Sequence, residues 1–155
     1  MKPPVYIETS IISYLAARPS RDLIVAANQQ ATHDWWNTRR TRFDLMISEI
    51  VLIEIAGGDA GAAVRRAVFA SGLRSAPATM EAAALAEEII RAARIPRRAV
   101  RDAAHIAIAA VEGAEFLLTW NCVHIANASL RPRIESVCIA AGFRPPVMCT
   151  PNQLM

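Results

Sequence analysis

Three acidic residues stand in apolar stretches of the sequence, where a carboxylate is unexpected. Glu8 ends a short β-branched run, Glu54 lies inside a longer apolar run, and Asp102 begins another. A carboxylate removed from water is costly unless it is paired or bound to a cation. If the three meet in one pocket, their mutual repulsion would be relieved by a hard divalent ion such as Mg²⁺ or Mn²⁺. The alternative is that each emerges at the polar edge of its helix or pairs with an arginine.

The histidines allow a second kind of site. Asp102 and His105 are three residues apart on a predicted helix and so share a face, and Asn121 and His124 repeat that spacing. A mixed site of histidine and carboxylate for a transition metal is therefore an open alternative. The favoured interpretation is that His105 supports the site by hydrogen bonding or packs its helix, since the chain has no further cluster of histidines.

The elements that must position these residues alternate between strand and helix. Strands are predicted at 5–7, 43–47, 73–76, 115–119 and 147–149. Helices are predicted from about 11, from 22 to the arginine cluster at 39–42, over 49–56, 59–71, 80–94, 97–112 and 122–128, and from 131 to 142. This order predicts one α/β domain over 1–155, with a parallel sheet covered on both faces. Ligands of such sheets bind at the carboxyl ends of the strands, where Glu8 and Asn121 fall.

Composition limits the class of protein. The chain has 155 residues, of which 54% are hydrophobic and 20% charged, and no apolar run near the ~20 residues of a membrane span. Its 17 basic residues are Lys2 and sixteen arginines, which suit phosphate recognition, although a GC-rich coding sequence explains them equally well. The N-terminus lacks the features of a signal peptide, so a cytoplasmic location and no membrane association are expected.

The cysteines and a tryptophan pair carry weaker predictions. Cys122, Cys138 and Cys149 show no metal-binding spacing and are expected to be small buried residues. Trp35 and Trp36 leave two interpretations open, an exposed surface for a partner or one ring facing the core.

Four stretches in order resemble the motifs of PIN-domain ribonucleases, and most closely those of VapC-like toxins of bacterial type II toxin–antitoxin pairs. The stretches are 5–10, 48–55, 102–107 and 117–121, so the resemblance covers nearly the whole chain. It implies a PIN-like three-layer α/β fold, with a mainly parallel sheet of four to five strands flanked by helices.

The resemblance also implies a catalytic site. Glu8, Glu54 and Asp102 match its first three acidic positions, as ligands of Mg²⁺ or Mn²⁺, and Asn121 matches a fourth position that is usually acidic. Hydroxyl positions that support the metal or its waters are matched by Thr9 and Thr119. Two departures matter: Glu8 is one methylene longer than the usual Asp, and Asn121 lacks a charge, which favours one tightly held ion.

The function that the resemblance implies is hydrolysis of RNA phosphodiester bonds by a homodimeric toxin with a cognate antitoxin. Contacts to RNA phosphates are expected from four arginines, Arg40, Arg97, Arg98 and Arg101. The alternative is a catalytically weak PIN-like module that binds RNA or a protein partner without cleavage, because Glu8 and Asn121 depart from the usual acids.

Overall fold

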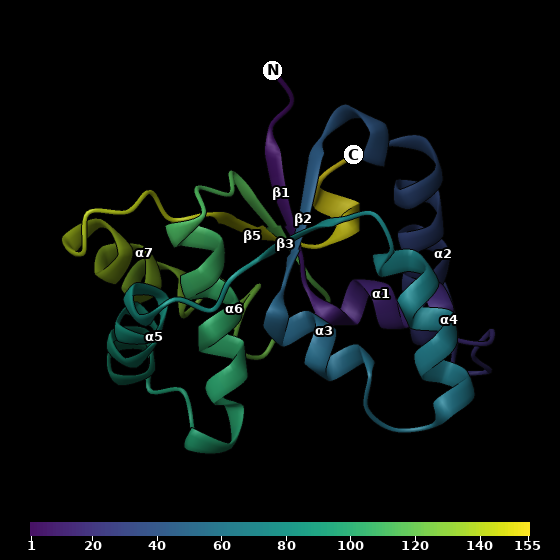
Figure 1. The fold of residues 1–155 in the computed structure, drawn as a ribbon, viewed down its shortest axis with the longest axis horizontal. Helices are drawn as coiled ribbons and strands as arrows, with labels where there is room; N and C mark the ends of the chain where they lie inside the picture. Colours follow the sequence, from purple (N-terminus) through teal and green to yellow (C-terminus); the bar gives the residue numbers. More distant parts are fainter.

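A five-stranded parallel sheet forms the centre of the protein, as a computed structural model of residues 1–155 shows (Figure 1). The strands are β1 (Pro4–Ile7), β2 (Asp44–Ser48), β3 (Arg74–Ala76), β4 (Phe116–Leu118) and β5 (Val147–Cys149), in the order β3-β2-β1-β4-β5. The central strand β1 pairs with both β2 and β4, so the connections run outward from it in two directions. The carboxyl end of β1 therefore lies where the strand order reverses, the usual ligand position in open α/β sheets.

Helices cover both faces of this sheet and make the three layers that the sequence predicts (Figure 1). They are α1 (Thr9–Ala16), α2 (Leu23–Thr38), α3 (Glu49–Ile55), α4 (Ala60–Ala70), α5 (Met80–Ala93), α6 (Val100–Val111) and α7 (Arg131–Ala140), with 3₁₀ turns η1 (Arg40–Arg42), η2 (Arg97–Ala99) and η3 (Pro151–Gln153). One side carries α1, α2 and α4, and the other carries α5, α6 and α7. Not one of these helices has the length and apolarity that crossing a bilayer requires.

Local capping explains where most helices begin. The side chains of Asp22, Ser48, Asp59 and Thr79 each accept a backbone N–H from the first turn of the helix that follows. The predicted starts of α2, α3, α4 and α5 are thereby confirmed. The predicted helix over 97–112 is instead the turn η2 followed by α6.

The prediction of a helix over 122–128 was wrong, because the chain forms only turns between β4 and α7. Asn121 Oδ1 accepts the backbone N–H groups of Val123 (3.2 Å) and His124 (3.1 Å). Farther on, Asn127 Oδ1 accepts the N–H of Ser129 (2.9 Å). Short polar side chains that bind nearby backbone in this way compete with helical hydrogen bonds. Asn121 thus caps a turn rather than a helix.

Both neighbouring tryptophans are buried, so neither forms an exposed partner surface. Trp35 stacks on Phe43 at 5.7 Å between ring centroids. Trp36 meets Phe69 of α4 edge to face at 5.9 Å, and the Arg40 guanidinium covers its ring at 5.0 Å. The interpretation that only one ring turns inward was wrong, because α4 and Arg40 cover the side of α2 that would otherwise face solvent.

The three cysteines differ in exposure, and this predicts their reactivity. Burial raises the pKa of the Cys138 and Cys149 thiols to about 11, whereas Cys122 is exposed, contrary to expectation, because it lies in the turns after β4. Only thiolates react rapidly, so a thiol reagent at neutral pH should modify Cys122 alone in the native protein and all three in denaturant. Mass spectrometry of the alkylated protein checks this; native modification of Cys138 or Cys149 would contradict it.

Candidate metal site

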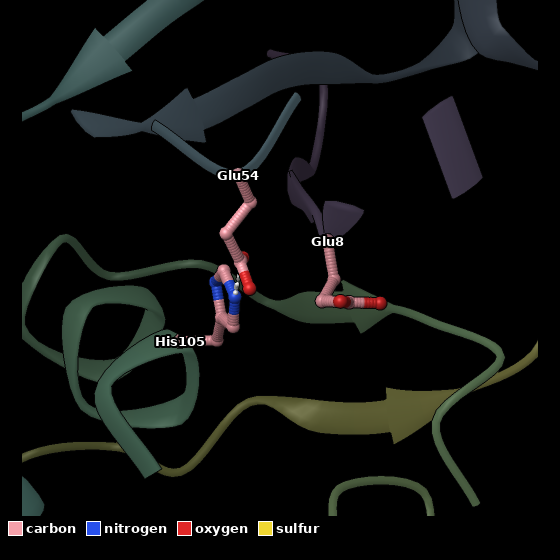
Figure 2. Close-up of side chains that lie close together, drawn as sticks. All are labelled: Glu8, Glu54 and His105. Atoms are coloured by element: carbon pink, nitrogen blue, oxygen red, sulfur yellow. Dashed lines mark hydrogen bonds and ion pairs between the residues drawn. The ribbon is translucent and has the colours of Figure 1, made fainter. Parts of the chain in front are cut away.

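Two acidic side chains and an imidazole meet at the carboxyl end of the sheet (Figure 2). Glu8 follows β1 and caps α1, Glu54 lies near the end of α3, and His105 lies in the second turn of α6. One possible ligand atom from each lies within 4.8 Å of the others. The structure therefore brings together Glu8, Glu54 and His105 from three different elements.

Glu8 is held by one carboxylate oxygen and leaves the other free. It is only 6% exposed, and its Oε2 accepts hydrogen bonds from the Ser10 N–H (3.1 Å), the Ser10 hydroxyl and the Thr119 hydroxyl (2.7 Å). Its Oε1 accepts no hydrogen bond. This oxygen is not fully buried either, because the only fully buried side-chain polar atoms without a partner are two arginine Nε atoms, so Oε1 reaches solvent. No arginine or lysine pairs with Glu8. A nearly buried carboxylate with only neutral donors is well suited to bind a cation.

Glu54 is held in the same way. Its Oε1 accepts a hydrogen bond from the Thr9 hydroxyl (2.7 Å) and lies 2.6 Å from His105 Nε2, while its Oε2 has no partner. Burial by itself raises the pKa of Glu54, but the hydrogen bond and charge of His105, the Thr9 hydroxyl and the positive charge of Arg101 together leave the pKa below its ordinary value. Glu54 is therefore ionised at neutral pH, with one oxygen available.

Behind His105, two hydroxyl groups complete a chain of hydrogen bonds. The imidazole is 1% exposed, and its Nδ1 lies 2.7 Å from the Tyr6 hydroxyl, which lies 2.6 Å from Ser48 Oγ. Burial is the main cause that raises the pKa of Tyr6 far above its ordinary value; the Ser48 hydrogen bond opposes this, and the charges of Glu8 and Glu54 add to it. Tyr6 therefore stays neutral and acts only as a hydrogen-bonding group.

Asp102 and Asn121 lie apart from this contact. Asp102, in the first turn of α6, is hydrogen-bonded through Oδ2 to His124 Nδ1 at 2.7 Å. Its carboxylate is not among the ligand atoms of Glu8, Glu54 and His105 that lie within 4.8 Å of one another. The side-chain oxygen of Asn121 accepts hydrogen bonds from the backbone of the turn after β4. The backbone N–H of Asn121 donates to the Thr119 hydroxyl (2.9 Å). Asn121 thus reaches Glu8 only through Thr119.

The four arginines predicted to contact RNA differ in what they do. Arg97 pairs with Glu87 at 3.0 Å, and Arg40 lies over a tryptophan ring. Arg98 and Arg101 are exposed and form no ion pair. The charge of Arg101 is felt by Glu54. Of the four, Arg101 is the one whose charge reaches the candidate metal site.

The donor set fits a divalent ion. Two carboxylates each keep one oxygen free, an imidazole nitrogen lies beside them, and no arginine or lysine forms an ion pair with either carboxylate. Oxygen donors of this kind bind Mg²⁺ and Mn²⁺, and a nitrogen donor adds affinity for first-row transition ions. Sequence reasoning missed Tyr6 and Ser10, although a tyrosine on a buried central strand signals that its hydroxyl needs a partner.

The lowered pKa of Glu54 predicts how acid affects stability. A carboxyl whose pKa is depressed by folding contributes stability above its ordinary value of 4.5, and this contribution is lost as the pH falls below it. Glu54→Gln cannot titrate, so its free energy of unfolding should fall less steeply with decreasing pH than that of the unaltered protein. Urea unfolding from pH 7 to pH 3 measures both slopes. Equal slopes below pH 4.5 would contradict the prediction.

The strand order and helix layers define a PIN-domain fold of the VapC type. One similar solved structure is VapBC2 from Rickettsia felis bound to a DNA fragment from its promoter, with 14% identity, a TM-score of 0.62 and coverage of 95% of this chain and 98% of that one. Another is FitAB bound to an IR36 DNA fragment, with 15% identity, a TM-score of 0.58 and coverage of 95% and 94%.

A third is Mycobacterium tuberculosis VapC20, described as a toxin that cleaves the sarcin–ricin loop, with 17% identity, a TM-score of 0.55 and coverage of 90% and 95%. No protein-family model and no curated protein sequence matches the chain. At these identities the likeness establishes the fold, and the site residues must be argued from their own geometry.

Proposed function

We propose that this protein is a divalent-metal-dependent endoribonuclease and the toxin of a toxin–antitoxin pair. The observation that carries the proposal is the meeting of Glu8, Glu54 and His105 at the carboxyl edge of a VapC-type sheet. A similar fold belongs to a toxin that cleaves the sarcin–ricin loop, which supports RNA as the substrate. Mg²⁺ or Mn²⁺ is the proposed ion.

Glu8 and Glu54 would have different roles in the hydrolysis. A bound divalent ion would lower the pKa of a water ligand and offset negative charge on the phosphate. Glu8 presents Oε1 to the ion, because Ser10 and Thr119 fix its other oxygen. Glu54 is ionised and presents Oε2, which can accept the proton of the attacking water.

Asp102 is proposed as a further ligand that exchanges its His124 partner for the ion when RNA binds. Asn121 supports the site from behind, through the hydroxyl of Thr119. Asp102→Asn, assayed on single-stranded RNA with Mn²⁺, tests the first role. A large loss of cleavage is expected, and undiminished cleavage would remove Asp102 from the mechanism.

The partners follow from the same proposal. Two of the similar structures contain toxin–antitoxin pairs bound to DNA, so we propose a cognate antitoxin for this chain, together with a homodimer and a cytoplasmic place of action. Arg98 in the turn η2 and Arg101 in the first turn of α6 are the proposed contacts to RNA phosphates, because both are exposed and form no ion pair. Co-expression with the protein encoded by the adjacent reading frame would test the antitoxin.

The decisive experiment incubates the purified protein with mixed RNA in Mn²⁺, in Mg²⁺ and in EDTA. Cleavage should occur with a metal ion, stop in EDTA and return when the ion is restored. Cleavage that continues in EDTA would overturn the metal-dependent mechanism. RNA retention on a filter without cleavage would favour the second candidate, a catalytically weak PIN-like module that binds RNA. The observation that supports this candidate is that Glu8 is longer than the usual Asp and Asn121 lacks the usual charge.

A further inference from the structure

We propose that His105 Nε2 is a ligand of the bound ion, together with Glu8 and Glu54, and that the site therefore selects a first-row transition dication such as Mn²⁺ over Mg²⁺. This inference deepens the proposed function, since it concerns the ion at the same site. It assigns to His105 a direct role instead of the supporting one that the sequence favours.

The imidazole of His105 lies directly beside the carboxylates. His105 Nε2 lies 2.6 Å from Glu54 Oε1 and belongs to the group whose atoms lie within 4.8 Å of one another. Two donors bound to one ion at about 2.1 Å can be at most about 4.2 Å apart. The widest pair of the group therefore needs to close by about half an ångström or more, while Nε2 and Glu54 Oε1, now 2.6 Å apart, need to separate slightly to share an ion.

The hydrogen bonds behind the ring of His105 are compatible with both of its neutral tautomers. Either oxygen of the Tyr6–Ser48 pair can be the donor, so this pair can serve both tautomers of the imidazole. In one arrangement Tyr6 donates to His105 Nδ1, and Nε2–H donates to Glu54. In the reversed arrangement Nδ1–H donates to Tyr6, Tyr6 donates to Ser48, and Nε2 turns a lone pair toward the carboxylates. That lone pair needs a cation beside the two glutamates.

The reversed arrangement is also what a metal-binding histidine requires. Such a histidine donates its other ring N–H to a protein acceptor, which fixes its tautomer and orientation. Here the acceptor is the Tyr6 hydroxyl, which is neutral and held by Ser48. The other partners of the two glutamates are neutral donors, namely Thr9, Ser10 and Thr119.

An imidazole ligand changes which divalent ion the site binds most tightly. Mg²⁺ takes oxygen ligands almost entirely and gives up its waters reluctantly. Imidazole nitrogen binds first-row transition ions, and affinity increases from Mn²⁺ to Cu²⁺ before it falls at Zn²⁺. A site with one imidazole and two carboxylates is therefore expected to bind Mn²⁺ more tightly than Mg²⁺.

The direct test examines the unaltered protein loaded with Mn²⁺. Electron spin echo envelope modulation should show coupling to the ¹⁴N of a directly bound imidazole, and calorimetry should give tighter binding of Mn²⁺ than of Mg²⁺. Bound Mn²⁺ without nitrogen coupling would overturn the proposal, and so would equal affinities for the two ions. This readout needs neither RNA nor a variant that folds.

Two variants and a matched control extend the test. His105→Gln replaces the imidazole by an amide and should abolish the coupling of a directly bound imidazole nitrogen. Tyr6→Phe removes the acceptor of Nδ1–H and should weaken Mn²⁺ binding by about 10–100-fold. His33→Gln changes a histidine on α2 that lies beside Gln29 and Gln30, and should leave both ion affinities unchanged. Circular dichroism confirms folding of each variant. Unchanged Mn²⁺ binding in a folded Tyr6→Phe protein would count against the tautomer argument.

Failure of this inference is distinguishable from failure of the proposed function. RNA cleavage that depends on metal, with no nitrogen coupling, would keep the ribonuclease and remove His105 from the ligands. Nitrogen coupling without any RNA cleavage would keep the ligand and overturn the ribonuclease.

Discussion

Replacing Glu8 by glutamine should reduce RNA cleavage by about a thousandfold under the proposed mechanism, in which several kcal/mol of transition-state stabilisation depend on the ion. The glutamine has nearly the same shape, but the donors around it dictate its orientation. Ser10 and Thr119 donate to the Oε2 position, so the amide oxygen must occupy it. The amide NH₂ then takes the place of Oε1 and turns a hydrogen-bond donor toward the ion. A ligand is thereby replaced by a group that repels a cation.

Initial cleavage rates in Mn²⁺ measure this effect, and calorimetry measures the accompanying loss of Mn²⁺ affinity. Glu81→Gln is the matched control, because it removes the same charge from an exposed position on α5 and should leave both quantities unchanged. Thermal unfolding shows whether Glu8→Gln remains folded. A folded Glu8→Gln protein that cleaves RNA at nearly the normal rate would contradict the role given to Glu8.

The fold was predictable from sequence wherever short-range chemistry decides it. The central strand is rich in strand-forming residues, namely Val5, Tyr6 and Ile7, and four helices are preceded by residues whose side chains cap the first turn. Each element is therefore specified within a few positions. The failures came where polar side chains offered the backbone other partners. Asparagine is a residue type that often caps helices, yet the side-chain oxygen of Asn121 stabilises a turn that no helix follows.

The site was predictable only in part, for a related reason. Acids in apolar runs identified Glu8 and Glu54 as residues that need a partner, and parallel strand order placed them at one edge. The partner itself depends on contacts between distant segments. Tyr6 meets His105 across 99 positions of sequence, and Asp102 meets His124 across 22. No spacing rule distinguishes the histidine that joins the glutamates from the one that binds Asp102.

Trp35→Ala should produce the largest loss of stability, about 3–5 kcal/mol, because it empties a fully buried position. The ring stacks on Phe43, and its Nε1–H donates to the Leu154 carbonyl at 2.8 Å. It therefore joins α2 to the C-terminal segment, which is 119 positions away in sequence. Thermal unfolding should show a midpoint lower by about 10 °C.

Two further variants separate packing from hydrogen bonding. Trp35→Phe keeps an aromatic ring against Phe43 and loses the bond to Leu154, so its cost should be smaller, about 1–2 kcal/mol. Ile24→Ala truncates a side chain on the same helix that is 74% exposed, and should change the free energy of unfolding by no more than about 0.5 kcal/mol. If Trp35→Ala is as stable as Ile24→Ala, the ring does not hold α2 against the sheet. A large loss for Trp35→Ala and a small one for Trp35→Phe would assign most of the stabilisation to packing, since only the first removes the ring.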